Sequence, residues 1–459
     1  MSAPGEIVVG LPARQAAYRA VRRVHEDGAW STRAVDWALR GSGLDARDRS
    51  FAANLAYETL RWEGTLDWAL GRVLTRPLGQ VQSELLDALR MGAWQLLRGG
   101  VPDRAAVGTT VDLVRAEIGP QATGFANGVL RGLARARDTL PGPDRRTDEG
   151  LGLALAYPPW VVAEARAVFG DRAEEVLAAG NVAPGLTLRA HPPGTREALL
   201  AELGDRGVDA TPTAHAHDGV RAPGADPAGL PAVAEGRATP QDEASMLLVQ
   251  ALATALTTPD VGGEGPLAGL RVLDAAASPG GKATYLAGLG AEVVAGDVRP
   301  GRTRLVAEAA RRLHVADRVR TVTADAGDPP FPPASFDAVL LDAPCTGLGV
   351  VRRRPELRWN RDPQDPGRLG DLQLALLTAL APLVRPGGVL VYGVCTWTRA
   401  ETTGVTRIFL AAEGDRFTPE DPLPALNGAG RPTPTAPGAL LDPAHDDTDG
   451  FYLTVLRAI

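Results

Sequence analysis

Residues 270–297 read LRVLDAAASPGGKATYLAGLGAEVVAGD, in which two short apolar runs flank a glycine-containing turn and a helical pattern. The first run ends at Asp274, the helix is expected to begin near Lys282, and the second run ends at Asp297. An apolar run followed by a glycine turn and a helix is typical of a β-α-β unit. These residues therefore predict two parallel strands joined by a helix.

The same alternation continues toward the end of the chain. Further strand patterns occupy residues 318–325, 336–344, 389–396 and 451–459. Repeated units of this length imply an open, mostly parallel, doubly wound α/β sheet of the Rossmann-like kind. Because ligands bind such sheets beyond the carboxyl ends of the strands, candidate functional residues are sought at those ends.

The first part of the chain has a different pattern. Apolar residues recur at three-and-four spacing through residues 13–136, including one long stretch over 46–72, with glycine and proline between the segments. This spacing predicts an all-α domain. The predicted organisation is a helical domain (1–140), a polar Pro/Gly-rich linker (141–155), a small α+β module (156–238) and the α/β domain (239–459).

The rarest residue types are the most informative part of the composition. The 459 residues include two cysteines, and lysine and arginine together number 48, of which only Lys282 is a lysine. Two cysteines exclude a disulfide scaffold, and no Cys-x-x-Cys pair is present to bind zinc, so no metal is expected. The net charge of −7 gives no overall basic surface for nucleic acid, so any such contact depends on local patches.

Nothing in the sequence predicts a membrane or secreted protein. No apolar run approaches the ~18–20 residues of a membrane span. The first residues, MSAPGEIVVGLPAR, lack the basic start and apolar segment of a signal peptide. We therefore expect a cytoplasmic protein.

The turn after Asp274 departs from the standard nucleotide-binding loops. A P-loop requires glycine where Ala276 stands and serine or threonine where Ala283 stands, and no Gly-x-Gly-x-x-Gly is present. Small residues and paired glycines still let backbone amides approach a ligand at a helix N-terminus. Asp297 is placed to bind a ribose diol and Asp325 to meet an adenine amino group, which together suit S-adenosylmethionine. An ordinary acidic turn residue remains the alternative for any one of these acids. The residues expected to bind the cofactor are Asp274, Ala275, Ala276, Ala277, Ser278, Pro279, Gly280, Gly281, Lys282, Asp297, Arg302, Asp325 and Asp342.

Both cysteines lie at strand ends. Cys345 follows the strand at 336–344, and Cys395 ends the strand at 389–396. A single cysteine is usually a small buried hydrophobe, but two at the ligand edge of one sheet favour a chemical role. A thiolate that adds to carbon-6 of a pyrimidine makes carbon-5 nucleophilic enough to take a methyl group from a sulfonium. Asp342 is placed to serve as the acid near ring nitrogen-3, and a base must then remove the carbon-5 proton.

The cysteine motifs resemble those of a known family. Pro-Cys-Thr-Gly at 344–347, followed by Val-Cys-Thr at 394–396, is similar to the RNA cytosine-5 methyltransferases of the Sun/Fmu type, the RsmB family. Segments along nearly the whole chain resemble the same family, namely its NusB-like RNA-binding domain (101–107 and 124–131), its middle module and entry helix (157–160, 186–190 and 241–245), its basic segment (352–359) and its closing strand (448–452).

The resemblance implies an enzyme that uses S-adenosylmethionine to form 5-methylcytosine in 16S rRNA. It assigns Cys395 as the nucleophile and gives Cys345 a part in product release. Together with Asp342 and Lys282, these are the residues that we expect to be catalytic. The expected partner is small-subunit ribosomal RNA, bound by a monomer. The alternatives are the same chemistry on tRNA, or a non-catalytic NusB-like RNA-binding factor in ribosome assembly.

Three positions depart from the family pattern. The family usually carries Cys-Ala-Ala-Pro where this chain has residues 276–279, and Ser-Thr where Gly393 and Val394 precede the cysteine. It commonly has asparagine after the glutamate, where Thr402 follows Glu401. None of these departures removes a catalytic group, so they concern substrate choice rather than reaction type.

Two sets of basic residues complete the predictions. Lys282 is the one basic position that is not arginine, and we infer that it reaches the site as a compact cation near Asp342 or the carboxylate of the cofactor. A basic cluster directly follows Cys345 and is expected to hold RNA phosphates, with a solvated loop as the alternative. The cluster consists of Arg352, Arg353, Arg354, Arg358 and Trp359, with Arg361 beside it.

Overall fold

A computed structural model describes residues 10–256 and 265–459. The chain forms two compact units, one made of residues up to Ala167 together with Arg353–Arg361, the other of Val168–Arg352 and Asp362–Ile459. Residues 1–9, which hold most of the segment tested for a signal peptide, lie outside the described residues. Within the described ranges, no helix is both long enough and apolar enough to span a membrane.

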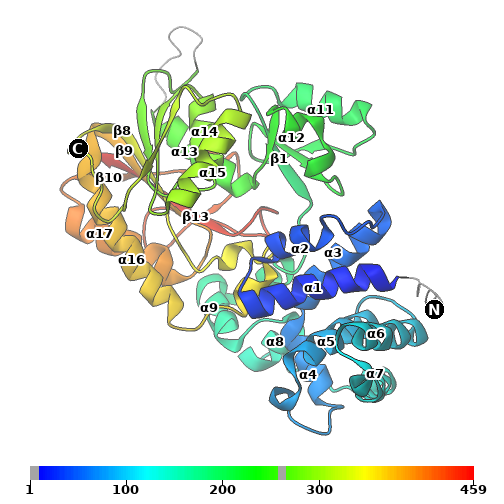
Figure 1. Ribbon diagram of the computed structural model, residues 1–459. Coiled ribbons are helices and arrows are strands. Elements are labelled where there is room, and N and C mark those ends of the chain that lie inside the picture. Colours follow the sequence, from blue (N-terminus) through cyan, green and yellow to red (C-terminus); the bar gives the residue numbers. More distant parts are fainter. Residues whose placement is uncertain (1–9, 257–264) are drawn as a thin grey trace. The chain divides into compact units, whose positions relative to one another are not determined.

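The first unit is helical, as its apolar spacing predicts (Figure 1). Buried alanine, valine and leucine side chains from successive helices form its core. The stretch over 46–72 forms two helices rather than one, because Trp62 leaves helical geometry with ψ 11°. The principal helices are α1 (Leu11–Asp27), α2 (Ser31–Leu39), α3 (Ala46–Arg61), α4 (Glu63–Gly71), α5 (Ser83–Leu97), α6 (Asp103–Glu117), α7 (Thr123–Ala136) and α8 (Asp148–Leu155), with α9 (Pro159–Phe169) beginning in this unit.

Helix α8 lies within the stretch expected to be a linker. Thr147 caps its N-terminus by accepting a hydrogen bond from the backbone N–H of Gly150. The Thr65 hydroxyl donates to the backbone oxygen of Leu153 at 2.7 Å. Residues 141–155 therefore do not form an extended linker, because their second half is a helix bonded into the helical unit.

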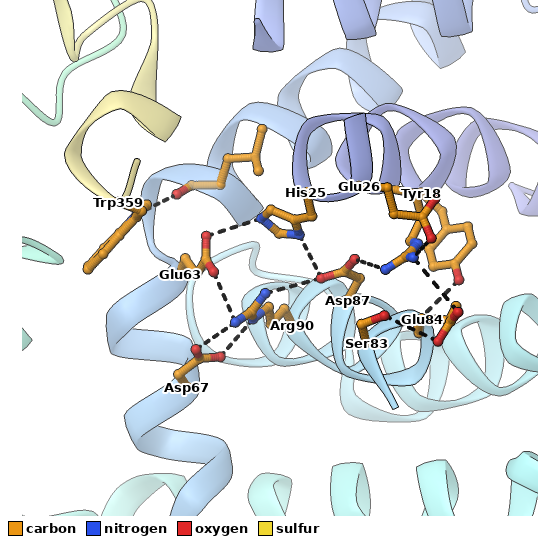
Figure 2. Close-up of polar contacts among 12 residues, drawn as sticks. Tyr18, His25, Glu26, Glu63, Asp67, Ser83, Glu84, Asp87, Arg90 and Trp359 are labelled. Atoms are coloured by element: carbon orange, nitrogen blue, oxygen red, sulfur yellow. Dashed lines mark hydrogen bonds and ion pairs between the residues drawn. The ribbon is translucent and has the colours of Figure 1, made fainter. Parts of the chain in front are cut away.

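The segment Arg353–Arg361 belongs to the helical unit, although strands of the other unit precede and follow it in sequence. Trp359 packs against the helical core and donates from its indole Nε1 to the backbone oxygen of Leu60 at 3.1 Å (Figure 2). A side chain at Gly64 would meet the Trp359 ring, because an added Cβ would lie 2.3 Å from it. The segment is thus anchored in the helical core.

A polar network joins helices α1, α4 and α5. Figure 2 shows His25 between Glu63 and Asp87, with Arg90 on the far side of both acids. His25 Nδ1 lies 2.8 Å from Asp87, His25 Nε2 lies 3.3 Å from Glu63, and Arg90 binds Asp67 through two bonds of 2.7 Å. Burial alone would lower the pKa of His25, but hydrogen bonds to the two acids and their charges raise it to about 9.

Replacing His25 with glutamine should therefore remove a pH-dependent part of the stability. The folded pKa of about 9 lies above the unfolded value of about 6.5, so the stabilisation is fully present below pH 6.5 and is lost as the pH rises through 9. The shift corresponds to on the order of 2–3 kcal/mol. Thermal unfolding from pH 6 to pH 10 should show a wild-type advantage that shrinks with pH. A pH-independent difference between wild type and His25→Gln would contradict the assignment.

The second unit begins with a small α+β module. Its sheet has the order β2-β3-β1-β4, with antiparallel neighbours throughout, and the leucine, valine and alanine side chains of its strands and helices form a separate small core. The predicted strand at 186–190 is present with those bounds. The elements are α10 (Ala173–Ala179), β1 (Leu186–Ala190), α11 (Arg196–Asp205), β2 (Thr211–Pro212), β3 (Gly219–Ala222), α12 (Pro231–Ala234) and β4 (Ala238–Pro240).

The rest of this unit is a doubly wound sheet. Five parallel strands run in the order β9-β8-β5-β6-β7. The antiparallel strand β13 pairs with β9, and the short strands β10 and β12 each pair antiparallel with β13. The short strand β11 pairs in turn with β12. The strands are β5 (Arg271–Asp274), β6 (Glu292–Asp297), β7 (Val319–Thr323), β8 (Phe336–Asp342), β9 (Val384–Val394), β10 (Phe417–Glu420), β11 (Arg431–Pro432), β12 (Ala439–Leu441) and β13 (Phe451–Ala458). The helices are α13 (Glu243–Leu256), α14 (Gly281–Gly288), α15 (Pro300–Arg312), α16 (Asp365–Leu380) and α17 (Thr403–Glu413).

Successive strand residues fill two cores on opposite faces of this sheet. Val272 belongs to a core shared with side chains of α13, α14 and α15, whereas its neighbour Leu273 belongs to a core shared with side chains of α16 and α17. Strands buried on both faces read as continuous apolar runs, which is why β8 was recognisable from sequence. The observed architecture matches the predicted fold class in all three parts.

Candidate functional site

The site lies where the strand order of the large sheet reverses. From β5 the chain proceeds outward to β6 and β7, and then returns to β8 on the other side of β5. The turn at residues 275–280 leaves β5 at this point. Ala275 N–H donates to the Leu340 oxygen of β8, and Ala277 N–H donates to the Gly296 oxygen of β6, at 2.9 and 2.8 Å. The turn is therefore fixed to both neighbouring strands at the place where such sheets bind ligands.

Gly280 closes this turn in a conformation that favours glycine. Its φ is +109°, and an added Cβ would lie 3.1 Å from the Cα of Val306 on α15. A side chain here would be strained and would push α15 away. Glycine thus lets the N-terminus of α14 lie close to its neighbours at the ligand edge.

Asp274, at the end of β5, is fully buried, and neither of its carboxylate oxygens makes a hydrogen bond of full geometry with the described residues. Burial raises its pKa to about 7, against the opposing charge of Lys282 and the nearby backbone N–H groups of Ala276 and Ala283. A buried acid with so few donors can accept a hydrogen bond from a donor on a ligand. The ammonium or hydroxyl groups of S-adenosylmethionine are such donors, so the turn and Asp274 fit this cofactor.

Two further acids predicted to bind the cofactor already have partners. Asp297, at the end of β6, pairs with Arg302 at 3.2 Å and accepts from the Arg299 N–H at 3.0 Å. Asp325 lies beyond β7 and accepts from the N–H of Gly327 at 2.8 Å. Their contacts with the cofactor stay predictions.

Lys282 and Asp342 form an ion pair across the reversal point. Lys282 Nζ donates to Asp342 Oδ2 at 2.6 Å, and its side chain is 13% exposed. Burial would lower the pKa of Lys282, but Asp342, Asp274 and Cys395 raise it. Ser245 Oγ lies 3.5 Å from the ammonium and the Phe451 ring 5.8 Å away. The lone lysine is therefore a compact cation among acids and thiols.

The two cysteines come together at the ends of β8 and β9. Their Sγ atoms are 3.1 Å apart, and both thiols are partly buried and free of disulfide bonds. The hydrogen bond to Cys395, burial, and the nearby charges of Cys395, Glu401 and Asp342 raise the pKa of Cys345. The fold thus places the four predicted catalytic residues Cys345, Cys395, Asp342 and Lys282 at one edge of one sheet.

Two of the departures from the family pattern have structural explanations. At Gly393 an added Cβ would lie 2.9 Å from both Leu248 and Phe451, so a side chain there would force these neighbours to move. The Thr402 hydroxyl donates to the backbone oxygen of Thr398 at 2.7 Å, which closes the turn that follows Cys395. Both residues serve local packing.

Arg189, which sequence reasoning did not select, supports the cofactor turn from the small module. It is fully buried on β1, and its Nε donates to Gln241 at 2.7 Å. Its Nη2 donates to the Thr284 hydroxyl at 3.1 Å, and the guanidinium lies 4.5 Å from the Tyr285 ring centroid. Arg189 therefore fixes the first turn of α14, which carries Lys282.

The burial of the basic cluster corrects the expectation that all its members face RNA. Arg358 is fully buried over the Tyr157 ring and donates to the backbone oxygen of Ala156. Arg352 is 5% exposed and binds the backbone oxygens of Val182 and Thr448. Trp359 is held in the helical core, as described above. Their side chains are engaged within the protein, whereas Arg353, Arg354 and Arg361 are at least partly exposed.

Comparison with known proteins agrees with this arrangement along the whole chain. Residues 265–457 match the family described as 16S rRNA methyltransferase RsmB/F, residues 11–135 match the NusB family, and residues 157–225 match the ferredoxin-like domain of RsmF/B-like methyltransferases.

Relatives and solved structures cover nearly the same length. A protein named as a methyltransferase from Mycobacterium tuberculosis is 37% identical over 465 residues, covering 98% of this chain and 97% of the relative. Ribosomal RNA small subunit methyltransferase B of Pseudomonas putida is 34% identical over 80% of this chain and 82% of its own length. The crystal structure of a protein designated PH0851 has the same fold, with a TM-score of 0.82, 23% identity and coverage of 99% of this chain and all of that one. The chain therefore belongs to the 16S rRNA methyltransferase RsmB/F family, whose methyl donor is S-adenosylmethionine.

Proposed function

We propose that the enzyme methylates carbon-5 of a cytosine in 16S rRNA through a covalent bond between Cys395 and carbon-6 of the base. The observation that carries this proposal is the pair of thiols 3.1 Å apart, beside the Lys282–Asp342 ion pair. Methylation of a ring nitrogen or a ribose hydroxyl requires no thiol. Carbon-5 of a pyrimidine, in contrast, becomes nucleophilic only after a nucleophile has added to carbon-6.

The cofactor would be held by the turn after β5. Asp274 supplies a buried acceptor, Gly280 allows the close approach, and Asp297 lies at the end of the next strand. When bound, S-adenosylmethionine supplies an electrophilic methyl group for carbon-5.

The charges around the thiols favour Cys395 as the nucleophile. The hydrogen bond to Cys395 and burial raise the pKa of Cys345, with smaller contributions from the charges of Cys395, Glu401 and Asp342, which disfavours its thiolate. The Lys282 cation, in contrast, lies close enough to Cys395 to interact with its charge. The Cys395 thiolate adds its electron pair to carbon-6, and a proton from the Lys282–Asp342 pair neutralises ring nitrogen-3. After methyl transfer, a base removes the carbon-5 proton, which restores the double bond and expels the Cys395 thiolate, and the proton on nitrogen-3 returns to the Lys282–Asp342 pair. We assign Cys345 an assisting role in this release.

Access to this site requires the base to leave its stack. A cytosine inside folded RNA must turn out of the helix to reach both the thiol and the cofactor. We assign backbone contacts to Arg353, Arg354 and Arg361 and to the basic residues of the NusB-like unit, which is the part of the chain expected to bind RNA. We expect the enzyme to act as a monomer in the cytoplasm, where ribosomal subunits assemble.

The test is the identity of the methylated nucleoside. Purified enzyme is incubated with S-adenosylmethionine and either unmodified 16S rRNA or unmodified tRNA. The RNA is then digested to nucleosides, which are separated and identified by mass spectrometry. We expect 5-methylcytidine from 16S rRNA alone. Product from tRNA alone would support the tRNA alternative, another methylated nucleoside would contradict the cytosine-5 chemistry, and RNA binding without any product would favour an assembly factor.

A further inference from the structure

A buried carboxylate lies behind the two thiols. Glu401 is fully buried in the turn after β9, and none of the ion pairs found among the described residues includes it. Its side chain instead accepts hydrogen bonds from neutral donors on three separate pieces of chain. Burial raises its pKa, and these hydrogen bonds lower it in part. Burying a carboxylate without a cation costs desolvation free energy, so such a residue is a candidate for a functional role.

The first group of donors holds the loop that carries Cys345. The backbone N–H of Thr346 donates to Glu401 Oε1 at 2.7 Å, and the Thr346 hydroxyl lies 2.6 Å from Oε2. On the other side of the cysteine, Gln373 of α16 donates to the Pro344 oxygen at 2.8 Å and to Glu401 Oε1 at 3.2 Å. The residues on both sides of Cys345 are thus held by hydrogen bonds.

The second group holds the loop that carries Cys395. The Thr398 hydroxyl donates to Glu401 Oε2 at 2.8 Å, and the Thr396 hydroxyl lies 3.4 Å from the same oxygen. The hydroxyls of Thr346 and Thr396 are 2.9 Å apart, so the residues that directly follow the two cysteines are bonded to each other and to one carboxylate.

We infer that Glu401 is the positioning residue that sets the distance between the two thiols, an inference that rests on the proposed role of both cysteines in the reaction. Glu401 touches neither sulfur, and it acts through the threonines beside them. Two independent loops, at the ends of β8 and β9, must present their sulfur atoms to the same base. A shared anionic acceptor with several donors fixes both loops to one point.

The test replaces this acceptor with minimal change of shape. In Glu401→Gln the amide nitrogen takes the place of one oxygen and cannot accept from the threonine hydroxyls. We expect kcat for RNA methylation to fall about 10- to 100-fold, as for a misplacement of about 1 Å, with KM for S-adenosylmethionine unchanged within about twofold. Thr346→Val removes one hydroxyl at constant shape and should have a smaller effect that is not additive with Glu401→Gln. Matched controls are the exposed variants Glu308→Gln and Thr321→Val.

A second readout is independent of methylation. The chain has only two cysteines, so a thiol titration reports on this site alone. Diamide takes two electrons and two protons from a pair of adjacent thiols, leaving a disulfide and the corresponding hydrazine. Wild-type enzyme should lose both free thiols together. In Glu401→Gln and Thr346→Val, both thiols should be lost several-fold more slowly. The unfolding temperature of each variant should stay close to that of its control.

The outcomes separate this inference from the proposed function. If both variants oxidise and methylate at the wild-type rate, Glu401 does not position the thiols and the inference is overturned. If oxidation slows in both variants but the wild-type enzyme forms no 5-methylcytidine, Glu401 still sets the distance between the thiols and the proposed chemistry fails. A loss of kcat in Glu401→Gln with a normal oxidation rate also contradicts the inference.

Discussion

Cys395→Ala is expected to abolish methyl transfer, by at least about 1,000-fold, while Cys345→Ala is expected to leave RNA covalently bound to the protein. Without the Cys395 sulfur, nothing adds to carbon-6 and carbon-5 stays unreactive. Without the Cys345 thiol, the first half of the reaction still runs, but release of the methylated base is slow. The measurement is incubation with 16S rRNA and labelled S-adenosylmethionine, followed by denaturing gel electrophoresis.

The gel distinguishes the two thiols directly. Cys345→Ala should give a labelled protein–RNA band that resists denaturation, and Cys395→Ala should give neither this band nor product. The double variant is the matched control, because it leaves the chain without any thiol and should give no adduct. If Cys395→Ala still methylates, or if the adduct appears in Cys395→Ala and not in Cys345→Ala, the two roles have been assigned the wrong way round or the thiols have another purpose.

The sheet could be predicted, and with it the meeting of the candidate site residues at one edge, because the decisive signals are local. Strand β8 is a run of apolar residues closed by Asp342, and the turn after β5 carries its glycines next to Lys282. Parallel strands place their carboxyl ends at one edge, so motifs 50 residues apart, at Cys345 and Cys395, could be expected to meet. The structure adds the distance between them.

What sequence could not provide depends on partners far away in the chain. Arg358 looks like part of a solvated basic loop until Tyr157 and Ala156, some 200 residues earlier, are found to enclose it. The same holds for Arg189, whose partners Gln241 and Thr284 lie on elements that only the fold brings together. An arginine run has no periodicity that reports burial, so the sequence predicted an exposed, RNA-binding cluster.

Short elements were missed for a different reason. The antiparallel strands β10, β11 and β12 are two to four residues long, and β10 and β11 contain proline, so none has an alternation long enough to recognise. The split at Trp62 of the helix expected over 46–72 is followed by Gly64, but a single glycine within a helical pattern does not by itself predict a break. In both cases tertiary contacts, rather than local propensity, decide the structure.

Lys282→Arg is expected to reduce methyl transfer about 100-fold, although the charge is kept. The ammonium sits 2.6 Å from Asp342, is 13% exposed, and has the Phe451 ring 5.8 Å away on another side. A guanidinium is larger and planar, and it cannot occupy this position without displacing Asp342 or the neighbouring ring. Because nitrogen-3 of the base would receive its proton from this pair, a displacement of about 1 Å is sufficient for the loss.

Steady-state kinetics with both substrates then distinguish what Lys282 does. A fall in kcat with unchanged KM for S-adenosylmethionine would place Lys282 with Asp342 in the proton transfer, whereas a raised KM with unchanged kcat would place it at the carboxylate of the cofactor. Asp342→Asn combined with Lys282→Arg should lose little more than either single variant, because the two side chains act as one pair. The matched control is Arg320→Lys, an exchange of the same two residue types at an exposed position of β7, which should keep wild-type kinetics. Near-normal turnover in Lys282→Arg would contradict the prediction that catalysis requires a compact ammonium at this position.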